Sequence, residues 1–238
     1  MINFINDEGI VINKQDYGEA DRYVTVFTKN MGKIVFFIKG IRKSKKREVS
    51  AVDVLTLSKF TFYRKKENYI VSNLQCCDSY SEIKQDLDNL GLSLYVMSVL
   101  NSVLVENNRK RKLFNITKKT LDYLKTSKDE KNNYTLIAYY LHYIIKDEGL
   151  RINKGEGNNF SFRESRFIQQ NEEFTYKVTN EQREILVKII EGKVREIIKG
   201  NYFISDLVRV ISLLEKYLNF QFGISLKLKN YFMGVGND

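Results

Sequence analysis

The feature that most constrains the fold is a change in the spacing of apolar residues near residue 77. From Gly9 to about Cys76, β-branched and aromatic residues occur in short runs separated by turn-forming residues, which is the pattern of β-strands. The five runs are GIVINKQ, RYVTVFT, KIVFFIK, VDVLTLSKFTFY and NYIVSNLQC. Five short strands in about 70 residues favour a closed or nearly closed barrel, because closure removes the exposed edges of an open sheet. We therefore predict a five-stranded β-barrel of the oligonucleotide-binding (OB) type over residues 1–78.

After residue 78 the apolar residues follow helical spacing instead. Ser79 and Glu82 form a candidate capping box for a helix that runs toward Leu90. A second helix is predicted after Gly91, because the next apolar residues recur at i, i+3, i+4 and i+7. This apolar stripe consists of Leu92, Tyr95, Val96, Val99, Leu100 and Val103.

Four further helices are predicted farther along the chain. They are expected near 114–124, over 134–148 with Gly149 as its cap, after a capping box at Thr179 and Gln182, and over 205–222 with Gly223 as its stop. Residues 153–178 are irregular and rich in Gly and Asn. The predicted fold class is therefore α+β, with the barrel followed by a helical domain over 79–238 that carries a polar insert at 153–178.

The charge of the chain indicates an anionic partner. Lys and Arg number 39 against 29 Asp and Glu, which gives a formal net charge of +10 and a field that attracts nucleic acid or an anionic membrane surface. Abundant Lys, Asn and Ile with no Pro and no Trp leave a biased genome composition as a second explanation of the overall charge.

Two cationic clusters fall at strand ends of the predicted barrel. The first is the run KGIRKSKKREV, and the second follows Phe62 and Tyr63. The candidate phosphate-contacting residues are Lys39, Arg42, Lys43, Lys45, Lys46, Arg47, Arg64, Lys65 and Lys66. Cationic loops next to aromatic faces are the recipe for binding single strands, although a solvated surface loop stays an alternative. The flanking runs hold six aromatics, of which we expect one or two to face a ligand: Phe36, Phe37, Phe60, Phe62, Tyr63 and Tyr69.

The sequence offers little for catalysis, and we predict that the protein is not an enzyme. Its single histidine, His142, falls within a predicted helix, and no P-loop, dinucleotide turn or nucleophile elbow is present. A structural zinc site needs about four Cys or His ligands, which adjacent Cys76 and Cys77 with one distant His do not supply. These neighbours are also poorly placed for a disulfide, so a reducing cytosol is expected. We predict no cofactor. Neither a signal peptide nor a membrane span is apparent.

The block from Asp16 to Arg47 resembles the N-terminal region of the RecO family of bacterial recombination mediators. The family pattern there is a D-Y-G-E-x-D-R turn, an apolar strand ending in F-T, a G-K pair and a K-G-x-R followed by cations. The matching residues are Asp16, Tyr17, Gly18, Glu19, Asp21, Arg22, Phe27, Thr28, Gly32, Lys33, Lys39, Gly40 and Arg42. A weaker likeness continues through LQCCDSYSEIKQDL and LLEKYLNFQFGISLKLKNYF. Many members carry a four-cysteine zinc site in the segment that corresponds to 153–178, whereas FSFRESRFIQQNEEF has no cysteine.

The resemblance implies an OB-type barrel, a helical domain and a non-enzymatic role in a bacterial cytoplasm, at the nucleoid. RecO-like proteins bind single- and double-stranded DNA, anneal complementary strands and, with RecR, help load RecA on strands coated by single-stranded-DNA-binding protein. They also bind the acidic tail of that coating protein, for which Arg109 and Arg111 are candidate contacts. No membrane is implied. A protein-interaction adaptor that does not bind DNA stays open, and a metal-dependent nuclease ranks last.

Overall fold

The structure is a computed structural model that describes residues 3–231. The chain divides into two compact units, Met1–Thr126 and Ser127–Asp238, and each is described by itself. The predicted boundary after residue 78 follows the change from strand to helix, whereas the first unit also holds the three α-helices that follow the sheet. The division into domains 1–78 and 79–238 therefore stays a prediction.

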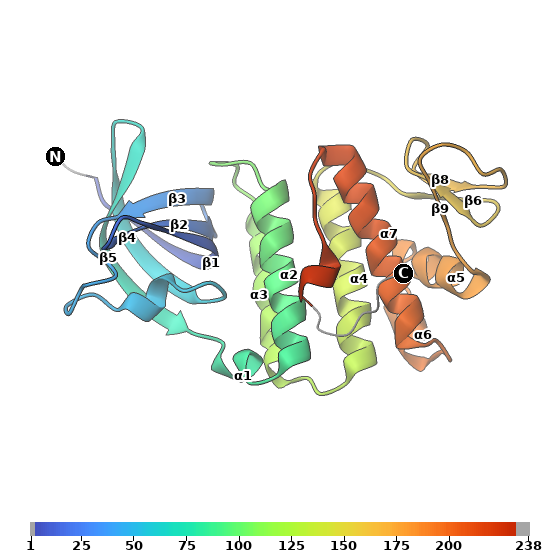
Figure 1. Ribbon diagram of the computed structural model, residues 1–238, viewed down its shortest axis with the longest axis horizontal. Coiled ribbons are helices and arrows are strands. Elements are labelled where there is room, and N and C mark those ends of the chain that lie inside the picture. Colours follow the sequence, from blue (N-terminus) through green and yellow to red (C-terminus); the bar gives the residue numbers. More distant parts are fainter. Residues whose placement is uncertain (1–2, 232–238) are drawn as a thin grey trace. The chain divides into compact units, whose positions relative to one another are not determined.

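The first unit contains a five-stranded antiparallel sheet, as the sequence predicts (Figure 1). Its strands are β1 (Ile5–Tyr17), β2 (Asp21–Thr28), β3 (Gly32–Ile38), β4 (Leu57–Lys65) and β5 (Asn68–Asp78). They lie in the order β3-β2-β1-β4-β5. The outer strands β3 and β5 also approach each other, and the rings of Phe36 and Tyr69 lie 6.5 Å apart. The sheet therefore curls toward closure, and the α+β fold with an OB-type barrel is confirmed.

The interior of the barrel follows from the alternation of its strands. In β3, Ile34, Phe36 and Ile38 are buried while the residues between them are partly exposed. The ring of Phe36 packs on Phe60 and Phe62, with centroids 5.4 and 5.1 Å away. Three of the six flanking aromatics, Phe36, Phe60 and Phe62, therefore belong to the core, while Phe37, Tyr63 and Tyr69 are partly exposed.

One predicted strand begins later than its sequence run suggests. The first part of VDVLTLSKFTFY overlaps a short 3-10 helix, η1 (Val49–Val52), and β4 starts only at Leu57. Ala51 and Val52 are buried in the barrel core, and Ser58 Oγ donates a hydrogen bond to the Ala51 carbonyl at 2.8 Å. Ala51 and Val52 thus fill the barrel interior from a 3-10 helix, although a buried apolar residue such as Val52 is equally compatible with a strand.

The first unit is completed by helices α1 (Ser81–Lys84), α2 (Leu87–Val103) and α3 (Arg111–Thr126). The predicted capping box at Ser79 is wrong, because Tyr80 precedes α1 in a left-handed conformation and makes no side-chain cap. The cap lies at Asp86, whose carboxylate accepts a hydrogen bond from the Asn89 amide at 3.0 Å. Helix α2 therefore starts before Gly91, and the predicted apolar stripe on it is buried.

The second unit contains the remaining helices of the described residues. They are α4 (Glu130–Asp147), α5 (Asn180–Ile190), α6 (Val194–Lys199), α7 (Ile204–Phe222) and the 3-10 helix η2 (Leu228–Tyr231). The predicted capping box of Thr179 and Gln182 is present at the start of α5. Gly149 and Gly223 have positive φ after α4 and α7, as expected for helix stops. Helix α6 was not predicted, because six residues are too few to show a helical period.

Residues 153–178 fold into a small four-stranded sheet instead of an irregular loop. Its strands are β6 (Asn153–Gly155), β7 (Asn159–Ser161), β8 (Arg166–Ile168) and β9 (Thr175–Lys177), in the order β6-β8-β7-β9. Buried Phe160 packs on Phe167 of β8 and on Tyr217 of α7, with ring centroids 5.3 and 5.7 Å away. Residues 3–231 contain no group of three or more His, Cys, Asp or Glu that could hold a metal ion. Aromatic packing therefore holds this sheet to α7.

None of the helices within residues 3–231 is both long enough and apolar enough to cross a bilayer.

Candidate nucleic-acid interface

The first cationic cluster is a loop, residues 39–49, whose base is fixed to the turn between β1 and β2. The Gly40 amide donates to the Asp21 carboxylate at 2.7 Å, and Gly40 has a φ of 63°, which glycine adopts without strain. Ile41 is fully buried in the barrel core. The Arg42 amide donates to the Ala20 carbonyl at 3.0 Å. We call this segment the cationic loop; its base is an ordered part of the barrel.

A network of charged side chains contacts the base of the cationic loop. The buried Arg22 guanidinium lies 2.8 Å from Asp16 Oδ1 and 3.5 Å from Asp53 Oδ1. Arg42 Nε lies 3.3 Å from the other Asp16 oxygen. The hydrogen bond from Arg22, opposed in part by desolvation, holds the pKa of Asp16 below its ordinary value. Asp16, Asp21 and Arg22 of the D-Y-G-E-x-D-R block therefore position the loop.

Three of the six predicted loop cations already have protein partners. Arg42 also donates from Nη1 to the Gly18 carbonyl at 3.1 Å, and Arg47 donates to the carbonyl of Lys39. Lys43 Nζ lies 2.7 Å from Glu19 Oε2, but both side chains are well exposed, at 64% and 88%. An exposed pair of this kind contributes little and exchanges readily with other charges. Lys43 is therefore available to a competing anion.

The other three loop cations, Lys39, Lys45 and Lys46, are exposed to solvent. Within residues 3–231 none of them takes part in an ion pair. They extend from a backbone that is fixed at its base, so their charges stay near one end of the barrel. This arrangement suits contact with phosphates, because a lysine ammonium acts as a mobile point charge.

The second cationic cluster, Arg64 to Lys66, lies at the opposite end of the strands (Figure 1). Strand β1 pairs antiparallel with β4 in the register Ile5↔Phe62 and Ile10↔Leu57, so the β4–β5 turn lies where β1 begins. The cationic loop contacts the turn where β1 ends. Arg64 pairs with Glu67 at 3.1 Å, while Lys65 and Lys66 are exposed. The structure does not bring the two predicted clusters together.

Arg109 and Arg111 lie at the same end of the barrel as Arg64. The segment before them is fixed by Asn107, whose amide donates to the Lys33 carbonyl at 2.9 Å. The Asn107 side chain accepts a hydrogen bond from the Tyr69 hydroxyl at 3.0 Å. Tyr69 is in turn paired with Arg64 in the sheet. Arg109 and Arg111 are both exposed. The predicted partner-binding residues therefore lie near the second cationic cluster, in the first unit.

The part of the chain that forms the barrel and the cationic loop is similar to known proteins. Residues 1–80 match the family model described as "Recombination protein O N terminal". Residues 1–80 therefore have the N-terminal region of the RecO family.

Several relatives of this chain carry the name DNA repair protein RecO. The protein of Acetivibrio thermocellus is 34% identical over 115 residues, which cover 48% of this chain and 46% of that protein. The protein of Alkaliphilus metalliredigens is 27% identical over 147 residues, which cover 62% of this chain and 59% of that protein. The chain thus spans about half the length of the curated relatives it matches.

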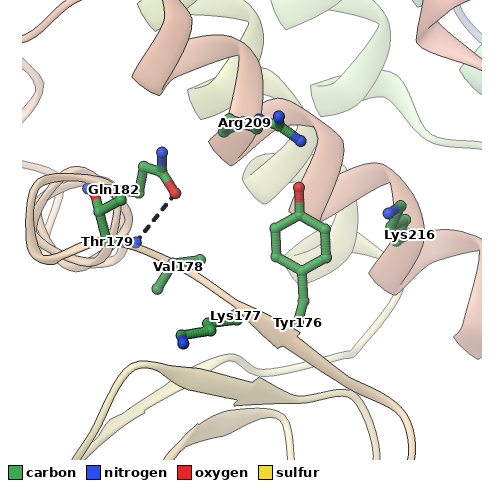
Figure 2. A pocket seen from close by; sticks show the side chains of 7 residues that line it. All are labelled: Tyr176, Lys177, Val178, Thr179, Gln182, Arg209 and Lys216. Atoms are coloured by element: carbon green, nitrogen blue, oxygen red, sulfur yellow. Dashed lines mark hydrogen bonds between the residues drawn. The ribbon is translucent and has the colours of Figure 1, made fainter. Parts of the chain in front are cut away.

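The second unit contains a cationic pocket that the sequence did not predict. The pocket has a volume of about 500 Å³, and Tyr176 of β9 points across it toward α7, which carries Arg209 and Lys216 (Figure 2). Lys216 Nζ lies 4.6 Å from the centroid of the Tyr176 ring. The remaining lining residues are Lys177, Val178, Thr179 and Gln182. Arg209 and Lys216 lie seven residues apart on α7, which is about two helical turns, so they share one face of the helix. This spacing could have indicated a cationic face, but the sequence analysis considered only the apolar face of this helix.

Proposed function

We propose that this chain is a DNA-binding recombination mediator of the RecO type, which anneals single strands. With RecR, it would help load RecA on strands coated by single-stranded-DNA-binding protein. The proposal rests chiefly on one observation: the barrel that matches the RecO model carries a loop fixed at its base, with three unpaired lysines. The names of the relatives support a role in DNA repair.

The chemistry of the cationic loop supports binding that does not depend on base sequence. Each lysine that neutralises a phosphate releases a condensed counterion, so affinity falls as the salt concentration rises. Phosphate contacts position the protein without reading bases. The loop has few free guanidiniums, because Arg42 and Arg47 are occupied by backbone carbonyls, and bidentate reading of guanine depends mostly on such groups. Both single and double strands are therefore expected ligands.

We assign the nucleic-acid contacts to two sets of residues. The principal set is the cationic loop, with Lys39, Lys43, Lys45 and Lys46 as contacts and Arg42 and Arg47 as supports. Arg64, Lys65 and Lys66 form a separate set at the other end of the barrel. A strand that reached both sets would have to run along the barrel, so the second set is expected to matter only for longer oligonucleotides.

The acidic tail of single-stranded-DNA-binding protein is proposed as a further ligand, with Arg109 and Arg111 as its contacts. Both are exposed cations next to the segment that Asn107 fixes. The pocket lined by Arg209 and Lys216 is also positively charged, so it is the competing binding site for the tail. A labelled tail peptide should lose affinity for the variant Arg109→Ala/Arg111→Ala. If instead only Arg209→Ala/Lys216→Ala weakens the peptide, the assignment to Arg109 and Arg111 is wrong.

We propose no catalytic site. His142 lies partly buried on α4, where burial and nearby Lys146 lower its pKa, so it is neutral near pH 7. An enzymatic reading would be revived if DNA incubated with the protein and magnesium or manganese were shortened.

The role of the loop in binding is tested by a charge-reversal variant with a matched control. The variant replaces Lys43, Lys45 and Lys46 with Glu. The control replaces Lys84, Lys119 and Lys199, which are also exposed, with Glu. Both changes alter the net charge equally, so long-range attraction cancels in the comparison. A fluorescent single strand titrated across a salt series should bind the loop variant far more weakly than the control, to a similar degree for different base sequences. Equal affinity of the two variants would exclude the loop as the contact site.

Annealing separates a mediator from a simple binder or an adaptor. Complementary strands coated by the cognate single-stranded-DNA-binding protein should pair faster with the wild-type chain than without it, and the loop variant should lose this acceleration. If the chain binds RecR equally well with and without the loop charges and shows negligible DNA binding, it is an interaction adaptor.

A further inference from the structure

Three aromatic side chains form a contiguous exposed cluster on the outer face of β1, β2 and β3. Tyr17 is 57% exposed, Tyr23 is 39% exposed and Phe37 is partly exposed. The centroid of Tyr17 lies 5.6 Å from Tyr23 and 5.7 Å from Phe37, and those of Tyr23 and Phe37 lie 4.8 Å apart. We call this cluster the aromatic triad. It is formed by residues 6 and 14 positions apart that the sheet brings together.

The triad is not part of the barrel core. Tyr23 and Phe37 are directly paired across β2 and β3, so their side chains lie on the same face. The residues on either side of them, Arg22, Val24, Phe36 and Ile38, are buried and point the other way. Clustered aromatic surface that stays in water is typical of a binding site.

The charged residues around the triad indicate which kind of ligand would bind there. The Arg42 guanidinium donates to the carbonyl of Gly18, the residue after Tyr17, and Lys39 follows Phe37 by two positions. The nearby acids are engaged: Asp16 by Arg22 and Arg42, Asp21 by the Gly40 amide, and Glu19 by Lys43. Lys39, Lys45 and Lys46 remain unpaired within residues 3–231. The matching ligand combines flat apolar faces with regularly spaced negative charges.

We propose that the aromatic triad stacks on the bases of a single DNA strand whose phosphates lie along the cationic loop. This inference rests on the proposed function and adds the residues that recognise bases. Every base has a flat face, so stacking tolerates any sequence. In a duplex these faces are already covered by neighbouring base pairs. The triad therefore gives the barrel a preference for single strands, while the cationic loop binds both forms.

The test compares a triad variant with a single aromatic substitution at the other end of the barrel. The variant carries Tyr17→Leu, Tyr23→Leu and Phe37→Leu, and the control carries Tyr63→Leu, whose ring packs on Phe4 with centroids 5.6 Å apart. Loss of one stacked base lowers affinity about 5- to 150-fold. We expect the triad variant to lose that much affinity for a short single strand, with its duplex affinity and the salt dependence of binding unchanged.

The outcomes separate this inference from the proposed function. If the triad variant binds single strands as tightly as the control while the lysine-reversal variant does not, the inference is overturned and DNA binding by the loop stands. If the wild-type chain binds no DNA, the proposed function fails first. If the triad variant loses only RecR, the triad is a protein-docking surface and the inference is again wrong.

A second variant keeps the test decisive if the triple substitution does not fold. The chain has no Trp, so Tyr23→Trp introduces a single reporter fluorophore. A short single strand should quench its emission at saturation, and a duplex of equal length should not. The corresponding Tyr63→Trp reporter should be insensitive to both. Equal response of the two reporters, or no response from Trp at position 23, would contradict base stacking at the triad.

Discussion

Removing one carboxylate should strengthen DNA binding. Glu19 holds Lys43 at 2.7 Å, and the substitution Glu19→Gln releases that lysine and removes a negative charge beside the cationic loop. The glutamine has the same shape, so the turn between β1 and β2 is preserved. Glu19 makes no hydrogen bond that fixes the base of the loop; Asp16 and Asp21 make those.

The size of the effect follows from the exposure of the pair. The Glu19 and Lys43 side chains are 88% and 64% exposed, and an ion pair in that setting is worth at most about 1 kcal/mol. Releasing Lys43 therefore increases affinity for a single strand by no more than about fivefold. One additional phosphate contact should also steepen the dependence of log affinity on log salt by about 0.7.

The assay is a fluorescence titration at several salt concentrations, with Glu173→Gln as the control. Glu173 pairs with Arg163 at 3.2 Å in the second unit, and these side chains are similarly exposed, at 71% and 61%. The control removes the same charge, so any gain from net charge alone appears in both variants. If Glu19→Gln weakens binding, or matches the control in affinity and salt dependence, Lys43 does not contact phosphate.

Three further predictions concern stability. Gly32 has a φ of 79°, and a Cβ there would lie 2.1 Å from the Asn108 carbonyl oxygen, so Gly32→Ala should lower the free energy of unfolding by more than about 1 kcal/mol. The control Gly18→Ala, also at positive φ but in open space, should cost less; equal denaturation midpoints would show that the contact with Asn108 is not rigid. Burial raises the pKa of Asp78, but the Lys125 ammonium at 2.8 Å and the Tyr80 amide outweigh it, so the net shift is downward from 3.8. The carboxylate therefore stabilises the fold above pH 3.8, and this contribution disappears as the pH falls through the lowered pKa; thermal melts of Asp78→Asn that keep the wild-type acid dependence would contradict this. Phe160→Ala should destabilise the second unit by about 3–5 kcal/mol, whereas dialysis against EDTA should leave the melting temperature unchanged; a drop on metal removal would mean that a metal stabilises the small sheet.

The barrel was predictable because strand periodicity and turn chemistry agree in this region. Buried and partly exposed residues alternate in β3, and short turns join β1 to β2, β2 to β3 and β4 to β5. The start of β4 was not predictable, because Val52 is typical of a strand yet lies in the 3-10 helix η1 and fills the barrel core from there. The helix start at Asp86 was missed because Ser79 and Glu82 have the spacing of a capping box, while Tyr80 takes a left-handed conformation there.

The candidate site was predictable in its residues but not in its arrangement. A run of cations is visible in any sequence, but which of them are paired depends on acids brought close by the β1–β2 turn, such as Glu19 for Lys43. The separation of Arg64 from the cationic loop depends on the strand register. The aromatic triad was missed for the same reason, because Tyr17 and Tyr23 lie on opposite sides of a turn and meet Phe37 only across the sheet.

The central claim is that single strands bind along the cationic loop, and lysine footprinting tests it most directly. Surface lysines of the full chain are acetylated with and without a saturating short oligonucleotide, and their modification is read by mass spectrometry. Lys39, Lys45 and Lys46 should be protected, while Lys84, Lys119 and Lys199, which are also exposed, should react as before. Protection confined to Lys177 and Lys216 of the second unit's pocket, with the loop lysines unprotected, would contradict the account.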